Sequence, residues 1–70
     1  MVRAKFVVAE VTRTTSGEKV VLMPVTGGSK ENESFFKWTP SGKIEMGIIN
    51  PDIKEFNPGD EFYVDFTKIQ

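Results

Sequence analysis

A lysine set among aromatic residues is the part of this chain most able to do chemistry. Phe35, Phe36, Lys37 and Trp38 follow one another directly. A lysine beside exposed rings is how nucleotides and single-stranded nucleic acids are held, because bases stack on the rings and phosphates pair with the cation. The same rings would serve as a protein–protein hot spot or as ordinary core. The cluster therefore predicts a binding surface and leaves open what covers it.

A glycine-serine run precedes this cluster. Gly27 and Gly28 lead into Ser29 and Lys30, and Asn32 follows in the same polar loop. Successive backbone N–H groups in such a loop are able to cradle one phosphate, although the full P-loop spacing is missing. A plain flexible loop is the alternative.

Three further residues on two strands are candidate ligand contacts. Tyr63 points outward if its neighbours in an alternating strand point inward, so it is placed to stack a base, anchor an interface or pair across strands. Arg3 and Lys5 share one face of the first strand and would add phosphate contacts, unless they are simply solvated charges. The candidate ligand-binding residues are Arg3, Lys5, Ser29, Lys30, Asn32, Phe35, Lys37, Trp38 and Tyr63.

Composition argues against an enzyme. The chain has no histidine and no cysteine, which removes Ser-His-Asp and Cys-His machinery and the usual zinc ligands. Glu31 and Glu33 stand in a polar loop that offers no desolvation to raise a carboxyl pKa. We therefore expect no catalytic residue, no metal and no cofactor.

The size and the net charge of the chain limit which partners and ligands are expected. The 70 residues are expected to form one domain over 1–70 with a thin core, and such domains often need a disulfide, a metal or oligomerisation. Because composition disfavours the first two, a homo-oligomer is expected, with a lone barrel as the alternative. The net charge of −1 supplies no basic track for a long polyanion and favours a small anionic ligand. No signal peptide or membrane span is evident, so the cytoplasm is expected.

Strand signals dominate the chain. Ala4–Thr14 and Lys19–Val25 are rich in β-branched residues and flank a turn at Thr15–Glu18, which predicts an antiparallel hairpin. Ile44–Ile48 and Phe62–Phe66 alternate apolar with other residues, as half-buried strands do.

The segment Ser34–Thr39 fits two structures. Ser29 could cap a short helix through Trp38, but aromatic residues favour strands and Thr39–Gly42 fits a type I turn, so a strand is preferred. Asp52–Phe56 is long enough for one helical turn only. The expected fold is an all-β, five-stranded antiparallel barrel, SH3-like or OB-like, with one helical turn before the last strand.

Three stretches carry a resemblance to known proteins. Gly28–Asn32, Phe35–Gly42 and Phe56–Thr67 resemble a family of small proteins encoded by tailed bacteriophages, and so does the opening Val2–Phe6. Relatives often have cysteine where this chain has Ala4. The resemblance implies a phage source and a bacterial host cytoplasm, and no particular activity. Small phage proteins of this size tend to be virion components, nucleic-acid binders or inhibitors of host defence.

Together these features predict a non-enzymatic phage binding module, oligomeric, that captures a nucleotide-type ligand. It would act as a sponge for a cyclic-nucleotide signal of host defence, or it would bind single-stranded nucleic acid. The alternative is a virion accessory protein or an inhibitor that binds a host protein.

Overall fold

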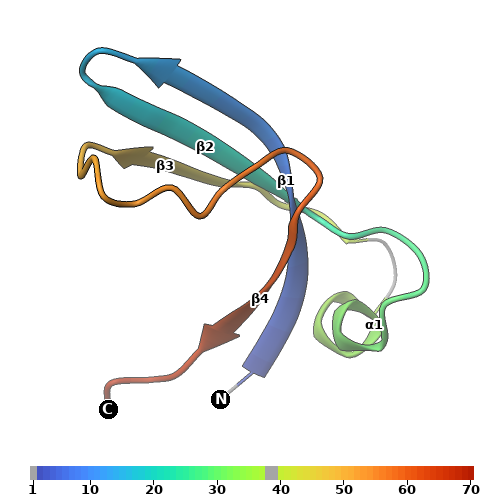
Figure 1. The fold of residues 1–70 in the computed structure, drawn as a ribbon. Helices are drawn as coiled ribbons and strands as arrows, with labels where there is room; N and C mark the ends of the chain where they lie inside the picture. Colours follow the sequence, from blue (N-terminus) through green and yellow to red (C-terminus); the bar gives the residue numbers. More distant parts are fainter. Residues whose placement is uncertain (1, 38–39) are drawn as a thin grey trace.

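The fold is a curled, mostly β arrangement with one short helix. The computed structural model describes residues 2–37 and 40–70. In this part of the chain lie β1 (Val2–Thr14), β2 (Gly17–Pro24), α1 (Lys30–Phe36), β3 (Ile44–Ile48) and β4 (Glu61–Phe66). The strands form one antiparallel sheet in the order β3-β2-β1-β4, curled into a half-barrel, and α1 lies beside the first half of β1 (Figure 1).

The long strand β1 makes the curl possible because it pairs with different partners along its length. Residues 2–7 pair with β4, and residues from Phe6 onward pair with β2. The register of the β1–β2 pair shifts between Val8 and Glu10, where β1 carries a bulge. A bulge bends its strand and increases the local twist, so one strand can serve both ends of the curl.

The hairpin between β1 and β2 turns where the sequence predicts it. Thr14 stands opposite Gly17, and its hydroxyl donates to the Gly17 carbonyl at 3.1 Å. Gly17 has φ of +139°, and a Cβ there would stand 2.7 Å from the carbonyl oxygen of Ile48. Only glycine therefore fits this turn without displacing the strand beside it.

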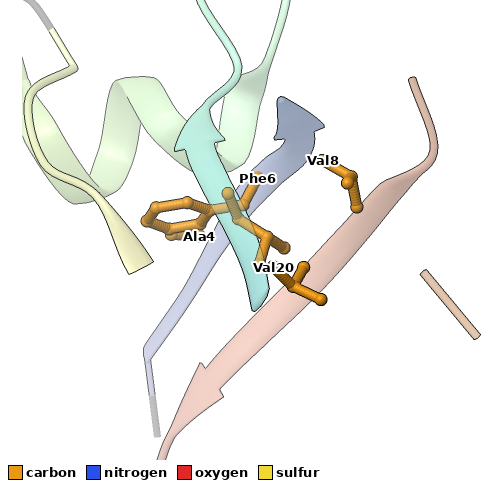
Figure 2. Close-up of a cluster of buried hydrophobic side chains, with 5 residues drawn as sticks. Ala4, Phe6, Val8 and Val20 are labelled. Carbon is orange, nitrogen blue, oxygen red and sulfur yellow. The ribbon is translucent and has the colours of Figure 1, made fainter. Parts of the chain in front are cut away.

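The core lies on the concave face of the sheet. Ala4, Phe6 and Val8 of β1 alternate onto this face and meet Val20 and Leu22 of β2. Figure 2 shows the four labelled side chains, from Ala4 to Val20, grouped beside these two strands. Partly buried residues from the helix, the other strands and the loops pack around them: Val11, Phe36, Ile44, Met46, Ile48, Phe56, Phe62 and Val64.

The strand predicted over Ser34–Thr39 is wrong in its described part. Ser34, Phe35 and Phe36 belong to α1, and Lys37 is the C-cap, so the weaker alternative of a helix capped by Ser29 is the one confirmed. Local capping outweighs the β preference of the aromatic residues. Thr39 lies outside the described residues. The described part of the chain has four strands, where the sequence predicted five.

The helical turn predicted over Asp52–Phe56 does not form. Instead the chain makes a tight turn after β3, in which the Ile53 N–H donates to the Asn50 carbonyl at 3.2 Å and the Asp52 N–H donates to Asn50 Oδ1 at 2.9 Å. Phe56 then packs on Phe62, with ring centroids 5.1 Å apart. Residues 52–56 therefore run along the surface of the core and do not wind into a helix. Among the residues described, no helix is both long and apolar enough to cross a membrane.

Candidate functional site

Asn32 fixes α1 beside β1. Its Oδ1 accepts the Lys5 N–H at 2.6 Å, and its Nδ2 donates to the carbonyls of Lys5 and Val25, each at 2.8 Å. β2 ends at Pro24, and beyond it the Val25 N–H still donates to the Lys5 carbonyl at 3.0 Å, but the Lys5 N–H and the Val25 carbonyl would otherwise lack partners. The buried side-chain amide supplies the missing hydrogen bonds and sets the position of the helix.

Ser29 begins that helix. Its hydroxyl accepts the Asn32 N–H at 3.2 Å and donates to Glu31 Oε1 at 3.1 Å. A hydrogen bond from its own backbone N–H lowers the pKa of the Glu31 carboxyl, the bond from the Ser29 hydroxyl lowers it further, and the charges of Lys5 and Arg3 contribute from nearby. Ser29 and Asn32 were predicted as ligand contacts, and the structure buries both within the protein.

Arg3, Lys5 and Tyr63 share the outer face of β1 and β4. The sequence predicted that Tyr63 points outward and that Arg3 and Lys5 lie on one face of their strand, but not that these faces are continuous. The Arg3 guanidinium lies 4.5 Å from the ring centroid of Tyr63 and binds Asp65 through Nε at 2.6 Å and Nη2 at 3.1 Å. This bidentate pair raises the pKa of Arg3 and lowers that of Asp65. Lys5 Nζ lies 3.5 Å from Glu61 Oε1. Tyr63 is half exposed: the Arg3 guanidinium covers one side of its ring, and the other side faces solvent.

A hollow of about 460 Å³ separates the start of β1 from α1, and it is lined by Val2, Arg3, Glu31, Ser34 and Phe35. We call it the β1–α1 hollow. Its volume lies in the range of small-molecule sites, about 300–1,000 Å³. Two of its lining residues, Arg3 and Phe35, are among the predicted ligand contacts. Arg3 joins the hollow to the exposed Tyr63 ring.

The charges around this hollow are mixed. Two cations, Arg3 and Lys5, stand among three carboxylates, those of Glu31, Glu61 and Asp65. A simple anion would gain little here, because the cations are already paired. A ligand that carries both phosphate and hydrogen-bond donors suits the arrangement better: Arg3 would take the phosphate and Glu31 would accept from hydroxyl or amino groups.

The remaining predicted contacts are more scattered. Lys30 is exposed at the start of α1. Lys37 is exposed at its end, with φ of +74°, and its N–H donates to the Glu33 carbonyl at 2.9 Å. Trp38 lies outside the described residues. The structure thus brings Arg3 and Phe35 together at the hollow, with Tyr63 beside Arg3 and Lys5 on the same face of the sheet.

The sequence did not indicate the acidic half of this site. Asp65 and Glu61 lie on the same face of β4 as Arg3 and Lys5 do on β1, with Asp65 directly opposite Arg3 and Glu61 diagonal to Lys5. Opposite charges at matching alternate positions of two strands were the available signal, because antiparallel pairing places such residues side by side. Nothing in the sequence indicated that Ser34 would line the hollow.

A second hollow, of about 580 Å³, lies between the hairpin turn and the loop after β3. Arg13 Nε binds Glu18 Oε2 there at 2.7 Å, and Arg13 Nη2 donates to the Phe56 carbonyl at 3.3 Å. Among the described residues, Glu18 Oε1 is the one buried side-chain polar atom that lacks a hydrogen-bond partner. Because this atom exposes less than 1 Å² to solvent, it offers no contact to a ligand in the hollow. No predicted site residue lines it.

Within residues 2–37 and 40–70, no group of three or more histidine, cysteine or acidic residues could hold a metal ion. No family model, curated protein or solved structure matches the chain.

Proposed function

We propose that this chain is a non-enzymatic binding module that captures a nucleotide-type ligand at the β1–α1 hollow. The position of Arg3 carries the proposal. Its guanidinium lines the hollow and lies 4.5 Å from the exposed ring of Tyr63. A phosphate on Arg3 would therefore stand within reach of a base stacked on the ring, which is the spacing a nucleotide requires.

The hollow favours a compact nucleotide over a long strand. The basic residues beside it are Arg3 and Lys5, each facing a carboxylate, so the described residues around the hollow form no continuous cationic groove for a phosphate backbone. Glu31 adds an acceptor for ribose hydroxyl or base amino groups. Single-stranded nucleic acid is the other ligand in this class. The sheet itself is proposed to be a small barrel of the SH3-like or OB-like kind, whose curved faces commonly serve as binding platforms.

The resemblance to small tailed-phage proteins suggests the setting. In the cytoplasm of an infected bacterium, an oligomeric protein of this kind would act as a sponge that sequesters a cyclic-nucleotide signal of host defence. The proposal requires stoichiometric binding and no turnover.

Thermal unfolding against a panel of mono-, di- and cyclic nucleotides and short oligonucleotides tests the proposal. A ligand at 100 times its dissociation constant adds about 2.7 kcal/mol, which raises the midpoint of a domain this small by about 10 °C or more. A selective rise for one class supports the proposal and names the ligand. A flat response across the panel, with the protein folded throughout, overturns it.

A second candidate function is a virion accessory protein or an inhibitor that binds a host protein. Exposed apolar side chains favour it, because Val2, Phe35 and Phe66 are 55%, 40% and 48% exposed. Under this function Phe66→Ser, at an exposed residue that does not line the hollow, would abolish capture of the partner protein, and Lys5→Gln would leave it intact. The reverse pattern, in binding of a purified nucleotide, would favour the first function.

A further inference from the structure

Three exposed apolar side chains form one surface at the open end of the half-barrel. Val2 and Phe66 stand opposite each other in the β1–β4 register, and the Phe35 ring lies 5.8 Å from the Phe66 ring. We call these three residues the apolar patch. A patch of aromatic and β-branched residues this exposed marks a contact surface more often than a solvated one.

The molecule exposes more surface than a compact chain of its size. Its accessible area is 5370 Å², against about 4,400 Å² for a compact monomer of this mass. Its radius of gyration is 13.3 Å, against about 11 Å for a chain of this length. The surplus of about 1,000 Å² is close to the area of about 800 Å² that each partner buries in a standard protein interface. One further copy of the chain would account for it.

An unpaired strand edge borders the patch. The order β3-β2-β1-β4 has no described strand beyond β4. Val8 exchanges hydrogen bonds with the segment just before β4, at 2.8 and 2.9 Å, so the even-numbered residues of β1 direct their backbone groups toward β4. In the β1–β4 register, the even-numbered residues of β4 lie opposite them and direct their own backbone groups toward β1. The backbone groups that point away from the sheet are those of Glu61, Tyr63 and Asp65.

We propose that a second copy of this chain docks along β4, with the two β4 strands antiparallel about a two-fold axis. Such an interface uses the same surface on both copies and continues the sheet from one copy into the other. It satisfies the outward backbone groups of β4 and extends the concave apolar surface across the axis. The β1–α1 hollow opens at the opposite edge of β1, but Val2 and Phe35 line it and Tyr63 lies beside Arg3, so the interface borders the proposed ligand site.

Charge selects the register of the pair. With the axis at Tyr63, Glu61 would stand opposite the partner's Asp65, which places like charges together. With the axis at Val64, Tyr63 stands opposite the partner's Asp65, and Phe62 stands opposite the partner's Phe66. The second register removes the repulsion and joins aromatic residues across the interface. We assign the axis to Val64.

Single cysteines test this geometry, because the chain has none of its own. At an axis through Val64, the two copies of that residue face each other with Cβ atoms about 4.5–5.5 Å apart, close enough for Val64→Cys to form a disulfide with small adjustment. Ile49→Cys is the matched control, because Ile49 is 83% exposed and far along the chain from β4. We expect Val64→Cys to form covalent dimers at least tenfold faster than Ile49→Cys under mild oxidation. Equal rates would overturn the proposal, and faster reaction of Tyr63→Cys would overturn the register.

The unmodified protein supplies a second test. Sedimentation or light scattering should give about twice the chain mass of 7.9 kDa. Phe66→Glu should reduce it to one chain, while Ile69→Glu, at a fully exposed position beyond β4, should not. Circular dichroism would show whether each variant keeps its strands. A single-chain mass for the unmodified protein at every concentration tested would contradict the interface, whatever nucleotide binding shows.

Discussion

The side-chain amide of Asn32 stands between Lys5 and Val25, the residue after β2 whose N–H donates to the Lys5 carbonyl at 3.0 Å. It accepts the Lys5 N–H at 2.6 Å and donates to the Lys5 carbonyl at 2.8 Å, as a backbone amide does in an antiparallel pair. The same amide bonds the Val25 carbonyl at 2.8 Å, on the chain that leaves β2. One buried side chain thus joins β1, the end of β2 and α1.

Asn32→Ala should therefore be among the most destabilising polar substitutions in the chain. It leaves the Lys5 N–H without an acceptor and removes a donor from two carbonyls in a site that is only 2% exposed. We expect a loss of about 2–4 kcal/mol in the free energy of unfolding, measured by chemical denaturation. Asn57→Ala, at an exposed position, is the control and should change stability by less than about 0.5 kcal/mol. Similar losses in the two variants would show that the amide is not the anchor.

Gly17 and Gly42 form a matched pair for a second prediction. Both have positive φ, +139° and +145°, but only Gly17 has atoms within 4 Å of an added Cβ. Gly42→Ala should cost about 1–3 kcal/mol from backbone strain alone. Gly17→Ala should cost at least about 1 kcal/mol more, because its methyl group would press on the Ile48 carbonyl 2.7 Å away. Equal costs, measured by urea unfolding, would place the strain in the backbone only.

The strands could be predicted because their signals are local. Apolar alternation in Phe62–Phe66 and Ile44–Ile48 is enough to define a half-buried strand and to point Tyr63 outward. The helix α1 could not be predicted with the same ease. Its residues Phe35 and Phe36 favour strands, and what holds the helix is a bond from Asn32 to Lys5, 27 positions away. Contacts at that separation leave no periodic trace in the sequence.

The candidate site, too, could be predicted from the sequence only in part. Alternation places Arg3 and Lys5 on one face of their strand, and the structure agrees. Their pairing with carboxylates depends on the β1–β4 register, which follows from the closure of the whole sheet. Ser29 and Asn32 are polar and stand beside glycines, so they read as ligand contacts. A capping serine and a buried amide have the same residue types, and burial alone distinguishes them.

The pair of Arg3 and Asp65 predicts a dependence of stability on pH. Arg3 lowers the pKa of the Asp65 carboxyl in the folded state, below its unfolded value of about 4. A carboxyl with a lowered folded pKa contributes stability that is present above the unfolded pKa and is lost as pH falls through the folded pKa. Asp65→Asn should therefore be less stable than the parent near neutral pH, and the difference should vanish in strong acid. Both side chains are partly exposed, 45% and 36%, so the difference should be small and should shrink in high salt.

Unfolding curves at several pH values measure that difference. Asp52→Asn is the control, because Asp52 lies exposed in the turn after β3. A difference between parent and Asp65→Asn that persists at the lowest pH would mean that the substitution acts through packing and not through charge.

The same pair makes the sharpest prediction about the ligand. If Arg3 receives a phosphate, Asp65 competes with that phosphate for the guanidinium, since it already binds Nε and Nη2 at 2.6 and 3.1 Å. Asp65→Asn should then tighten binding of the active nucleotide several-fold, while Arg3→Gln should weaken it at least tenfold. Lys19→Gln is the matched control for lost charge, because Lys19 is exposed and paired with Glu45 at 2.9 Å away from the hollow. Isothermal titration with the nucleotide that raises the unfolding midpoint gives all four affinities. Weaker binding by Asp65→Asn would mean that the carboxylate holds Arg3 in place for the ligand, and equal losses in Arg3→Gln and Lys19→Gln would mean that only net charge matters and that the site lies elsewhere.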